Sequence, residues 1–301
     1  MATLERAQPW LGTWVSIRAQ SGPHGPGALE QAVTAAFAAI AEVHQHLSVH
    51  HPASELSRLN QTAHLQPVRV STPLWQVLRR ARQVWQISGG AFDCVRASER
   101  LRAWGLLPDW CQTGAQAMGA ADPARSDRAS LADVALQAGQ QVLFRQPLAL
   151  DFGGIAKGYA VDRAAIVLRQ HGVREALINA GGDLRVLGYA PEPIWVRDGR
   201  DSQRLHLLGE LSHGACATSA VYYSAQTTPG GQPCSALVDP RHGNALLAPH
   251  SHTVLARTAC MADALTKVLA VRGLAGAQPI LARFGAVGLL LDQHGQLHSS
   301  S

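Results

Sequence analysis

The sequence lacks any run of about 18 apolar residues, so it contains no segment that could form a membrane-spanning helix. Hydrophobic residues still make up 47% of the 301 residues, which is enough to build a substantial core. A chain of this length suits one large domain or two tightly joined ones. We therefore expect a soluble globular protein.

Cysteines are few and widely spaced: there are five, and none belongs to a CxxC pair. This pattern excludes a disulfide framework and a structural zinc site, and it favours a reducing compartment. The N-terminal segment carries Glu5 and Arg6 where a signal peptide needs an apolar run, and no lipid-anchoring cysteine lies near the start. We expect a cytoplasmic protein, or a periplasmic one if the N-terminus has been shortened.

Clusters of basic residues are also lacking. The net charge is +5, but lysine and arginine are scattered instead of forming the stripe typical of nucleic-acid binders. The charge therefore favours anionic small molecules as ligands. The sequence has no GxxxxGK[ST] loop, no GxGxxG after a strand and no GxSxG, which excludes P-loop, Rossmann and α/β-hydrolase sites.

Hydrophobic periodicity predicts both strands and helices. Thr72 is the expected N-cap of one helix, with Pro73 in its first turn and Gly89–Gly90 at its end. Residues 111–140 are expected to hold an exposed loop and a short helix. Without a regular βαβ alternation the chain is predicted to be α+β, with mixed sheets and flanking helices. We expect a single unit over residues 1–301, or two packed subdomains at roughly 1–145 and 146–301. Strands are expected at 12–18, 176–180, 184–187 and 252–257, and further helices at 29–47, 159–170 and 261–271.

The first site-like segment is Asp151–Gly158, with the sequence DFGGIAKG. Its two glycines let the backbone approach a ligand closely, and the helix that follows offers free N–H groups. Lys157 adds a positive charge, so the segment suits a pyrophosphate. A tight turn before a helix is the structural alternative.

The second segment is Met261–Lys267. On a helix, Asp263, Thr266 and Lys267 stand at positions i, i+3 and i+4 and face the same way. A carboxylate and a hydroxyl at this spacing suit a hard cation such as Mg²⁺. The alternative is a surface ion pair between Asp263 and Lys267.

Two glycine pairs mark further segments. Asn179–Asp183 (NAGGD) is predicted to be a turn between strands that needs a positive φ at a glycine. Ser88–Asp93 places Phe92 and Asp93 just past a helix end, where they suit a contact with a ring and a ribose, although a buried phenylalanine is the default. The histidines at 44, 46, 50 and 51 are better explained by a solvated helix end than by a metal site.

Taken in order, these segments resemble the FAD:protein FMN transferase family, the ApbE-like proteins, over nearly the whole chain. The strongest match is LDFGGIAKGYAVD at residues 150–162. The ordered motifs are far more specific together than any one alone. The other motifs are Leu11–Thr13, Ser54–Asn60 (SELSRLN), Gly89–Asp93 (GGAFD), Asn179–Asp183, Val238–Gly243 (VDPRHG) and Ala262–Thr266.

The resemblance implies an α+β protein that binds FAD and Mg²⁺, moves FMN from FAD to a threonine of a partner redox protein, and releases AMP. The metal and Lys157 would stabilise the charge on the departing AMP. Asp151, Lys157 and Asp263 are the implied catalytic residues. The implied flavin contacts are Leu11, Ala91, Phe92, Asp93, Asp151, Lys157 and Leu237, and the implied metal ligands are the Gly154 carbonyl, Asp263 and Thr266.

Three positions depart from the family pattern. Lys267 stands four residues after Asp263, where the family usually has a threonine, and Thr266 lies one position earlier. Ala236 stands where the family has a histidine, and Ala220 replaces a glycine. Asp151 and Asp239 are candidates for a general base by position only. Two alternatives to transfer follow: an FAD pyrophosphatase that yields FMN and AMP, and a flavin carrier without catalysis.

Overall fold

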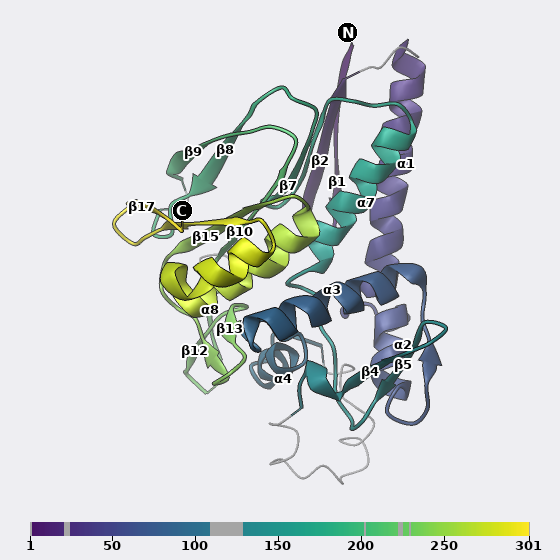
Figure 1. Ribbon diagram of the computed structural model, residues 1–301, viewed down its shortest axis with the longest axis vertical. Helices are drawn as coiled ribbons and strands as arrows, with labels where there is room; N and C mark the ends of the chain where they lie inside the picture. The colour runs from purple at the N-terminus through teal and green to yellow at the C-terminus, as the bar shows by residue number, and fades with distance from the viewer. Residues whose placement is uncertain are drawn as a thin grey trace. The chain divides into compact units, whose positions relative to one another are not determined.

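The computed structural model describes residues 2–20, 25–108, 129–201, 203–221, 225–228 and 230–300. The backbone groups into two compact units, each assembled from separated stretches of the chain (Figure 1). Unit 1 contains residues 1–44, 155–223 and 248–301, and unit 2 contains residues 45–154 and 224–247. The single catalytic unit expected over residues 1–301 stays a prediction. The segment 111–128, where a loop and part of a helix were expected, lies outside the described residues.

Unit 1 is organised around an eight-stranded sheet in the order β1-β2-β6-β7-β10-β15-β16-β17. Side chains alternate in β2, where Val15, Ile17 and Ala19 are buried, as the sequence pattern predicts. Ala176–Ala180 and Asp183–Leu187 confirm two predicted strands. The strands are β1 (Thr3–Trp10), β2 (Thr13–Gln20), β6 (Ala176–Ala180), β7 (Asp183–Leu187), β10 (Ala215–Ala220), β15 (Ser251–Ala256), β16 (Val287–Leu291) and β17 (Leu297–Ser299), and a separate hairpin joins β8 (Glu192–Arg197) to β9 (Leu205–Leu211).

Three long helices accompany this sheet: α1 (Gly25–Leu47), most of which belongs to unit 1, α7 (Ala156–Gln170) and α8 (Ala259–Arg283). α7 packs on β6 and β7, and α8 packs on β10, β15 and β16. The helix expected at 261–271 begins two residues earlier, because the Thr258 side chain accepts a hydrogen bond from the Met261 N–H. Gly273 interrupts the helix with a φ of 65°, where the sequence predicts a stop, but helical turns resume beyond it to Arg283.

The described residues of unit 2 combine three α-helices with short strands. The helix expected from Thr72 has Ser71 as its N-cap, since the Ser71 hydroxyl accepts a hydrogen bond from the Leu74 N–H. The predicted end at Gly89 is confirmed by its left-handed φ of 59°, a conformation that glycine adopts without a steric penalty. The elements are α2 (Glu55–Thr62), β3 (Val68–Arg69), α3 (Thr72–Ser88), α4 (Arg96–Ala103), the 3-10 turn η2 (Leu131–Asp133), β4 (Val134–Gln137), β5 (Gln141–Phe144), β11 (Gln226–Thr227), β12 (Pro233–Cys234), β13 (Val238–Asp239) and β14 (Asn244–Ala245).

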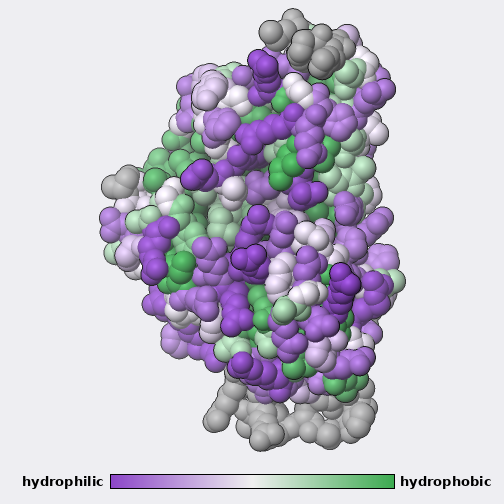
Figure 2. Space-filling view, turned by 45° about the vertical axis from the view of Figure 1, so that its right-hand side comes forward, coloured by the Kyte–Doolittle hydropathy of each residue, from purple (hydrophilic) through white to green (hydrophobic). Residues whose placement is uncertain are grey.

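The α+β class is confirmed by this mixture of helices and sheets. The sheets themselves are antiparallel and not mixed as predicted, because the strand pairs among the described residues are all antiparallel. Hydrophilic side chains are spread over most of the face seen in Figure 2, with hydrophobic ones in groups between them. Within the described residues no helix is long and apolar enough to cross a membrane.

His252 in β15 makes stability depend on pH. Its side chain is buried, and the Nδ1 atom has no hydrogen-bond partner. Burial, and then the neighbouring His250, lower the pKa of His252 from 6.5 to about 4. Between these values the unfolded chain binds a proton that the folded chain does not, so stability is fully present above pH 6.5 and falls as the pH drops toward 4.

We expect the free energy of unfolding to fall by about 3 kcal/mol as the pH drops from 6.5 to 4, because the unfolded chain takes up a proton on His252 that the folded chain does not. In His252→Leu that part of the pH dependence should be absent. Chemical denaturation of both proteins at several pH values measures the difference. If the free energy of unfolding changes equally with pH in the parent and the variant, the assignment to His252 is contradicted.

Candidate functional site

Five segments of the chain converge at one end of the unit 1 sheet. The β1–β2 turn meets the β6–β7 turn, since a Cβ atom on Gly181 would lie only 2.6 Å from the Thr13 hydroxyl. The end of β10 meets α8, because the hydroxyls of Ser219 and Thr266 are 2.7 Å apart. The start of α7 joins them through Lys157. The predicted glycine turn is confirmed by φ values of 62° at Gly181 and 101° at Gly182.

The centre of this region is a group of four charged residues, Lys157, Asp183, Asp263 and Lys267, which we call the lysine–aspartate cluster. Lys157 Nζ lies 3.4 Å from Asp183 Oδ2 and 3.9 Å from Asp263 Oδ2. Lys267 Nζ donates to Asp263 Oδ1 and also lies 3.2 Å from the Asp263 carbonyl oxygen. The Asp263 side chain is fully buried, whereas 28% of the Lys157 side chain and 19% of the Lys267 side chain are exposed.

Burial and charge act in opposite directions on the two carboxyl groups. Burial raises the pKa of Asp263, but the attraction of Lys157 and Lys267 outweighs it and holds the pKa below its ordinary value. For Asp183, burial and the charge of Asp263 together raise the pKa to about 7. Asp263 is therefore the stable anion of the cluster.

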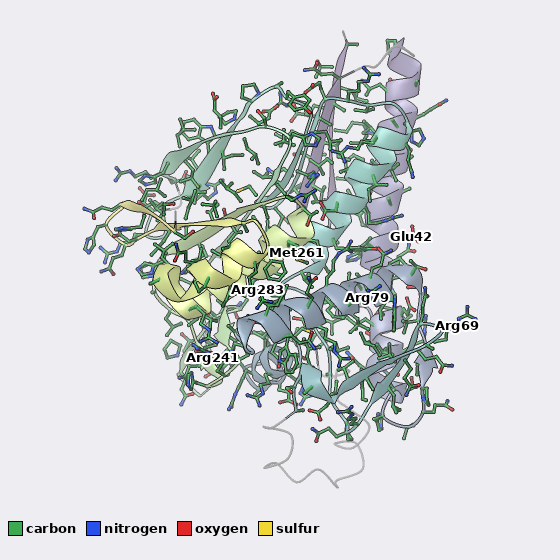
Figure 3. All side chains as sticks on the ribbon, in the orientation of Figure 1. Glu42, Arg69, Arg79, Arg241, Met261 and Arg283 are labelled. Carbon is green, nitrogen blue, oxygen red and sulfur yellow. The ribbon has the colours of Figure 1, made fainter. Side chains whose placement is uncertain are left out.

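The close approach of α7 and α8 positions Asp263. The Asp162 carboxylate of α7 accepts hydrogen bonds from the Ala259 and Cys260 N–H groups, both at 2.9 Å, at the start of α8. Gly158 of α7 donates its N–H to Asp263 Oδ2 at 3.3 Å. Figure 3 labels Met261 in the first turn of α8, two residues before this carboxylate.

Thr266 is also fully buried. The ion pair between Asp263 and Lys267 that the alternative predicts does form, but its carboxylate is buried and does not lie on the surface. The Thr266 hydroxyl donates to the Asp263 carbonyl oxygen at 2.6 Å and shares a hydrogen bond with Ser219. Asp263 and Thr266 thus do lie on one face of α8, as their spacing predicts. That face is covered by α7 and β10 instead of facing solvent.

Leu11 occupies the β1–β2 turn in an uncommon conformation. Its φ is 58°, followed by 73° at Gly12, between the paired residues Trp10 and Thr13. A two-residue hairpin turn with two positive φ values normally takes asparagine or glycine at the first position. A leucine there costs about 1 kcal/mol and is the kind of local strain found at functional sites.

In unit 2, the GGAFD segment is mostly buried. The side chains of Ala91, Phe92 and Leu237 are buried. These residues can therefore offer a ligand mainly their backbone atoms. One Asp93 oxygen accepts hydrogen bonds from the Val95 and Arg96 N–H groups. Burial raises the pKa of Asp93 despite these bonds.

A cavity of about 370 Å³ opens beside this segment in unit 2. Arg241, at the wall of this cavity, donates two hydrogen bonds to Asp239, at 3.0 Å from Nε and 2.8 Å from a terminal nitrogen. Burial raises the pKa of Asp239, but Arg241 and His242 lower it to a net value of about 2. A carboxylate so weakly basic and so engaged is a poor general base. The cavity is lined by Trp85, Gln86, Gly89, Gly90, Asp93, Arg96, Ser130 and Arg241.

Asp151 and Gly154 also belong to unit 2, immediately before the chain enters unit 1. Asp151 Oδ1 accepts a hydrogen bond from the Gly153 N–H at 3.0 Å, which shapes the glycine pair into a turn. Of the discounted histidines, His46 pairs with Glu55 at 2.7 Å. No group of three or more potential metal-binding side chains of the His, Cys, Asp and Glu types occurs in the described part of the chain.

The fold is that of an α+β protein with a buried charged cluster at one end of its eight-stranded sheet. The ApbE family model matches residues 11–290, and the chain belongs to the ApbE family. It is 27% identical to an FAD:protein FMN transferase of Salmonella typhimurium over 269 residues, which cover 83% of this chain and 73% of the relative. It is 31% identical to one of Klebsiella pneumoniae over 209 residues, 65% of this chain and 61% of the relative.

Solved structures share the fold. The flavin transferase ApbE of Vibrio cholerae has a TM-score of 0.79 at 23% identity, with 100% of this chain and 97% of that chain covered. The ApbE protein of Thermotoga maritima has a TM-score of 0.82 at 23% identity, with 99% and 96% covered. The relatives from Rhodobacter capsulatus and Klebsiella pneumoniae are matched over only 46% and 61% of their own lengths.

Proposed function

We propose that the protein is an FAD:protein FMN transferase that moves FMN from FAD to a threonine of a partner protein. The observation that carries the proposal is the lysine–aspartate cluster, which gathers motifs of the ApbE family at one end of a sheet. Relatives named for this activity support it. The threonine oxygen forms the new bond to the phosphorus on the flavin side. The pyrophosphate bond breaks, AMP leaves with the bridging oxygen, and the hydroxyl proton is released.

The proposed residue roles follow from exposure and charge. The partly exposed ammonium of Lys157 binds the phosphates and stabilises the charge that develops as AMP leaves. Asp263 is a positioning residue, because it is fully buried and holds the ammonium of Lys267 while lying near that of Lys157. Leu11, Asp93 and Asp151 contact FAD, and Ala91, Phe92 and Leu237 do so through their backbone. The cavity with Arg96 and Arg241 takes the flavin or its ribityl arm.

Mg²⁺ is the metal that the family resemblance implies, with the Gly154 carbonyl, Asp263 and Thr266 as ligands. The donor atoms in unit 1 fit it poorly. Each Asp263 carboxylate oxygen already accepts a hydrogen bond, one from Lys267 and one from Gly158. The Thr266 hydroxyl is engaged with a carbonyl oxygen and with Ser219.

One assay separates this proposal from the two alternatives. Purified protein is incubated with FAD, with and without an acceptor domain that carries a threonine, and AMP is measured by chromatography. We expect AMP to form only with the acceptor, because its hydroxyl is the nucleophile. AMP without the acceptor would indicate a pyrophosphatase, and bound FAD without AMP in either sample would indicate a carrier. Either result would contradict the proposal.

A further inference from the structure

Lysine is very rare in this protein, and the few lysines lie together at one site. Of the 26 lysine and arginine residues, only Lys157 and Lys267 are lysines. Both belong to the lysine–aspartate cluster, while arginine supplies the other cationic side chains. A lysine ammonium is a compact, strongly hydrated point charge, whereas a guanidinium is a wide planar fork. Among side chains, lysine is thus the closest in shape and charge to a small metal ion.

We propose that the Lys267 ammonium is a built-in cation that takes the place of a divalent metal at Asp263. The inference rests on the proposed function, since it concerns which cation balances the Asp263 carboxylate at the same site. Lys267 Nζ lies against the Asp263 carboxylate and carbonyl oxygens, which are the hard oxygen atoms that would otherwise attract Mg²⁺. The side chain comes from the next turn of the same helix, so the fold itself fixes this ammonium in place.

Charge balance supports the same conclusion. With two aspartates and two lysines the cluster is close to neutral without any added ion. Two unit charges 4 Å apart repel by about 4 kcal/mol at an effective dielectric constant of 20, and a divalent ion would face roughly twice that from each neighbouring ammonium. Mg²⁺ also requires near-octahedral oxygen coordination. The engaged oxygens of Asp263 and Thr266 do not offer it.

The test measures metal binding and FAD binding separately. Mn²⁺ serves as the metal probe and is titrated by electron paramagnetic resonance, and FAD affinity is measured by fluorescence in Mg²⁺ and in EDTA. We expect the parent protein to bind no Mn²⁺ at this site and to hold FAD equally well in both buffers. Binding of a single Mn²⁺ ion per chain that Mg²⁺ displaces, together with loss of FAD in EDTA, would overturn the inference.

Lys267→Thr removes the ammonium and frees the Asp263 carboxylate. We expect this variant to gain one Mn²⁺ site and to bind FAD about tenfold more tightly with Mg²⁺ than with EDTA, a coupling of ordinary size. Arg283→Thr is the matched control, because it removes one charge from the exposed end of the same helix. It should gain no metal site.

If Lys267→Thr folds but gains no metal site, the inference is overturned. If that variant does not fold, the Mn²⁺ titration of the parent protein still decides. A parent protein that binds no FAD in either buffer would refute the proposed function. The inference about Lys267 would then still be tested by the Mn²⁺ titration alone.

Discussion

Asp263→Asn is expected to slow flavin transfer strongly and to lower the free energy of unfolding by about 3 kcal/mol, the lower end of the range for breaking a buried ion pair. The asparagine keeps the shape and can still accept the Gly158 hydrogen bond. It removes the charge that holds the ammonium groups of Lys157 and Lys267. These groups would then repel each other, although their partial exposure to water limits the loss of stability.

Chemical denaturation and the rate of AMP formation measure the two effects of Asp263→Asn. We expect the rate to fall at least about a hundredfold, as when a preorganised charge is lost from an active site. Asp201→Asn is the matched control, because Asp201 is exposed and its Oδ1 accepts a local hydrogen bond from the Gln203 N–H, which asparagine can preserve. A variant at position 263 that is as stable and as active as the control would refute the role of the cluster.

Gly158→Ala is expected to destabilise the protein by more than about 3 kcal/mol, beyond the usual cost of overpacking. The added Cβ would lie 2.2 Å from the Ala259 carbonyl oxygen and 2.8 Å from the Cys260 nitrogen. These are backbone atoms of α8, so no side-chain rotation relieves the clash. The two helices must separate, and the hydrogen bond from Gly158 to Asp263 is lost with them.

Thermal and chemical unfolding of Gly158→Ala should be compared with Gly27→Ala. Gly27 lies in α1, and a Cβ there would meet no atom within 4 Å. Because alanine favours the helix and reduces the freedom of the unfolded chain, this control should be stabilised by up to about 1 kcal/mol. Similar stability of the two variants would contradict the close packing of α7 on α8.

Local patterns predict the elements of unit 1 well where turns delimit them. The strand at Ala176–Ala180 lies between Gly172 and the Gly181–Gly182 turn, and the structure has the same bounds. The strand Thr3–Trp10 escapes prediction, because charged and polar residues interrupt its alternation at the edge of the sheet. Pairing with β2 supplies the regularity that its sequence lacks.

The candidate site is only partly visible in the sequence. The spacing of Asp263 and Lys267 predicts that they meet, but a sequence cannot show that α7 buries one of them. Asp183 has no role assigned by the sequence, because an acid after two glycines is typical of a turn. Its burial beside Lys157 depends on β10 and α7, which are distant in the chain. Ser219 is likewise found only through its contact with Thr266.

The most direct test of the account is the intact mass of an acceptor domain after incubation with this protein and FAD. The acceptor is compared with a variant in which its threonine is alanine. We predict that the parent acceptor gains the mass of one FMN group, that an equal amount of AMP forms, and that the variant acceptor stays unchanged. An unchanged parent acceptor beside fully bound FAD would contradict the assignment as a flavin transferase.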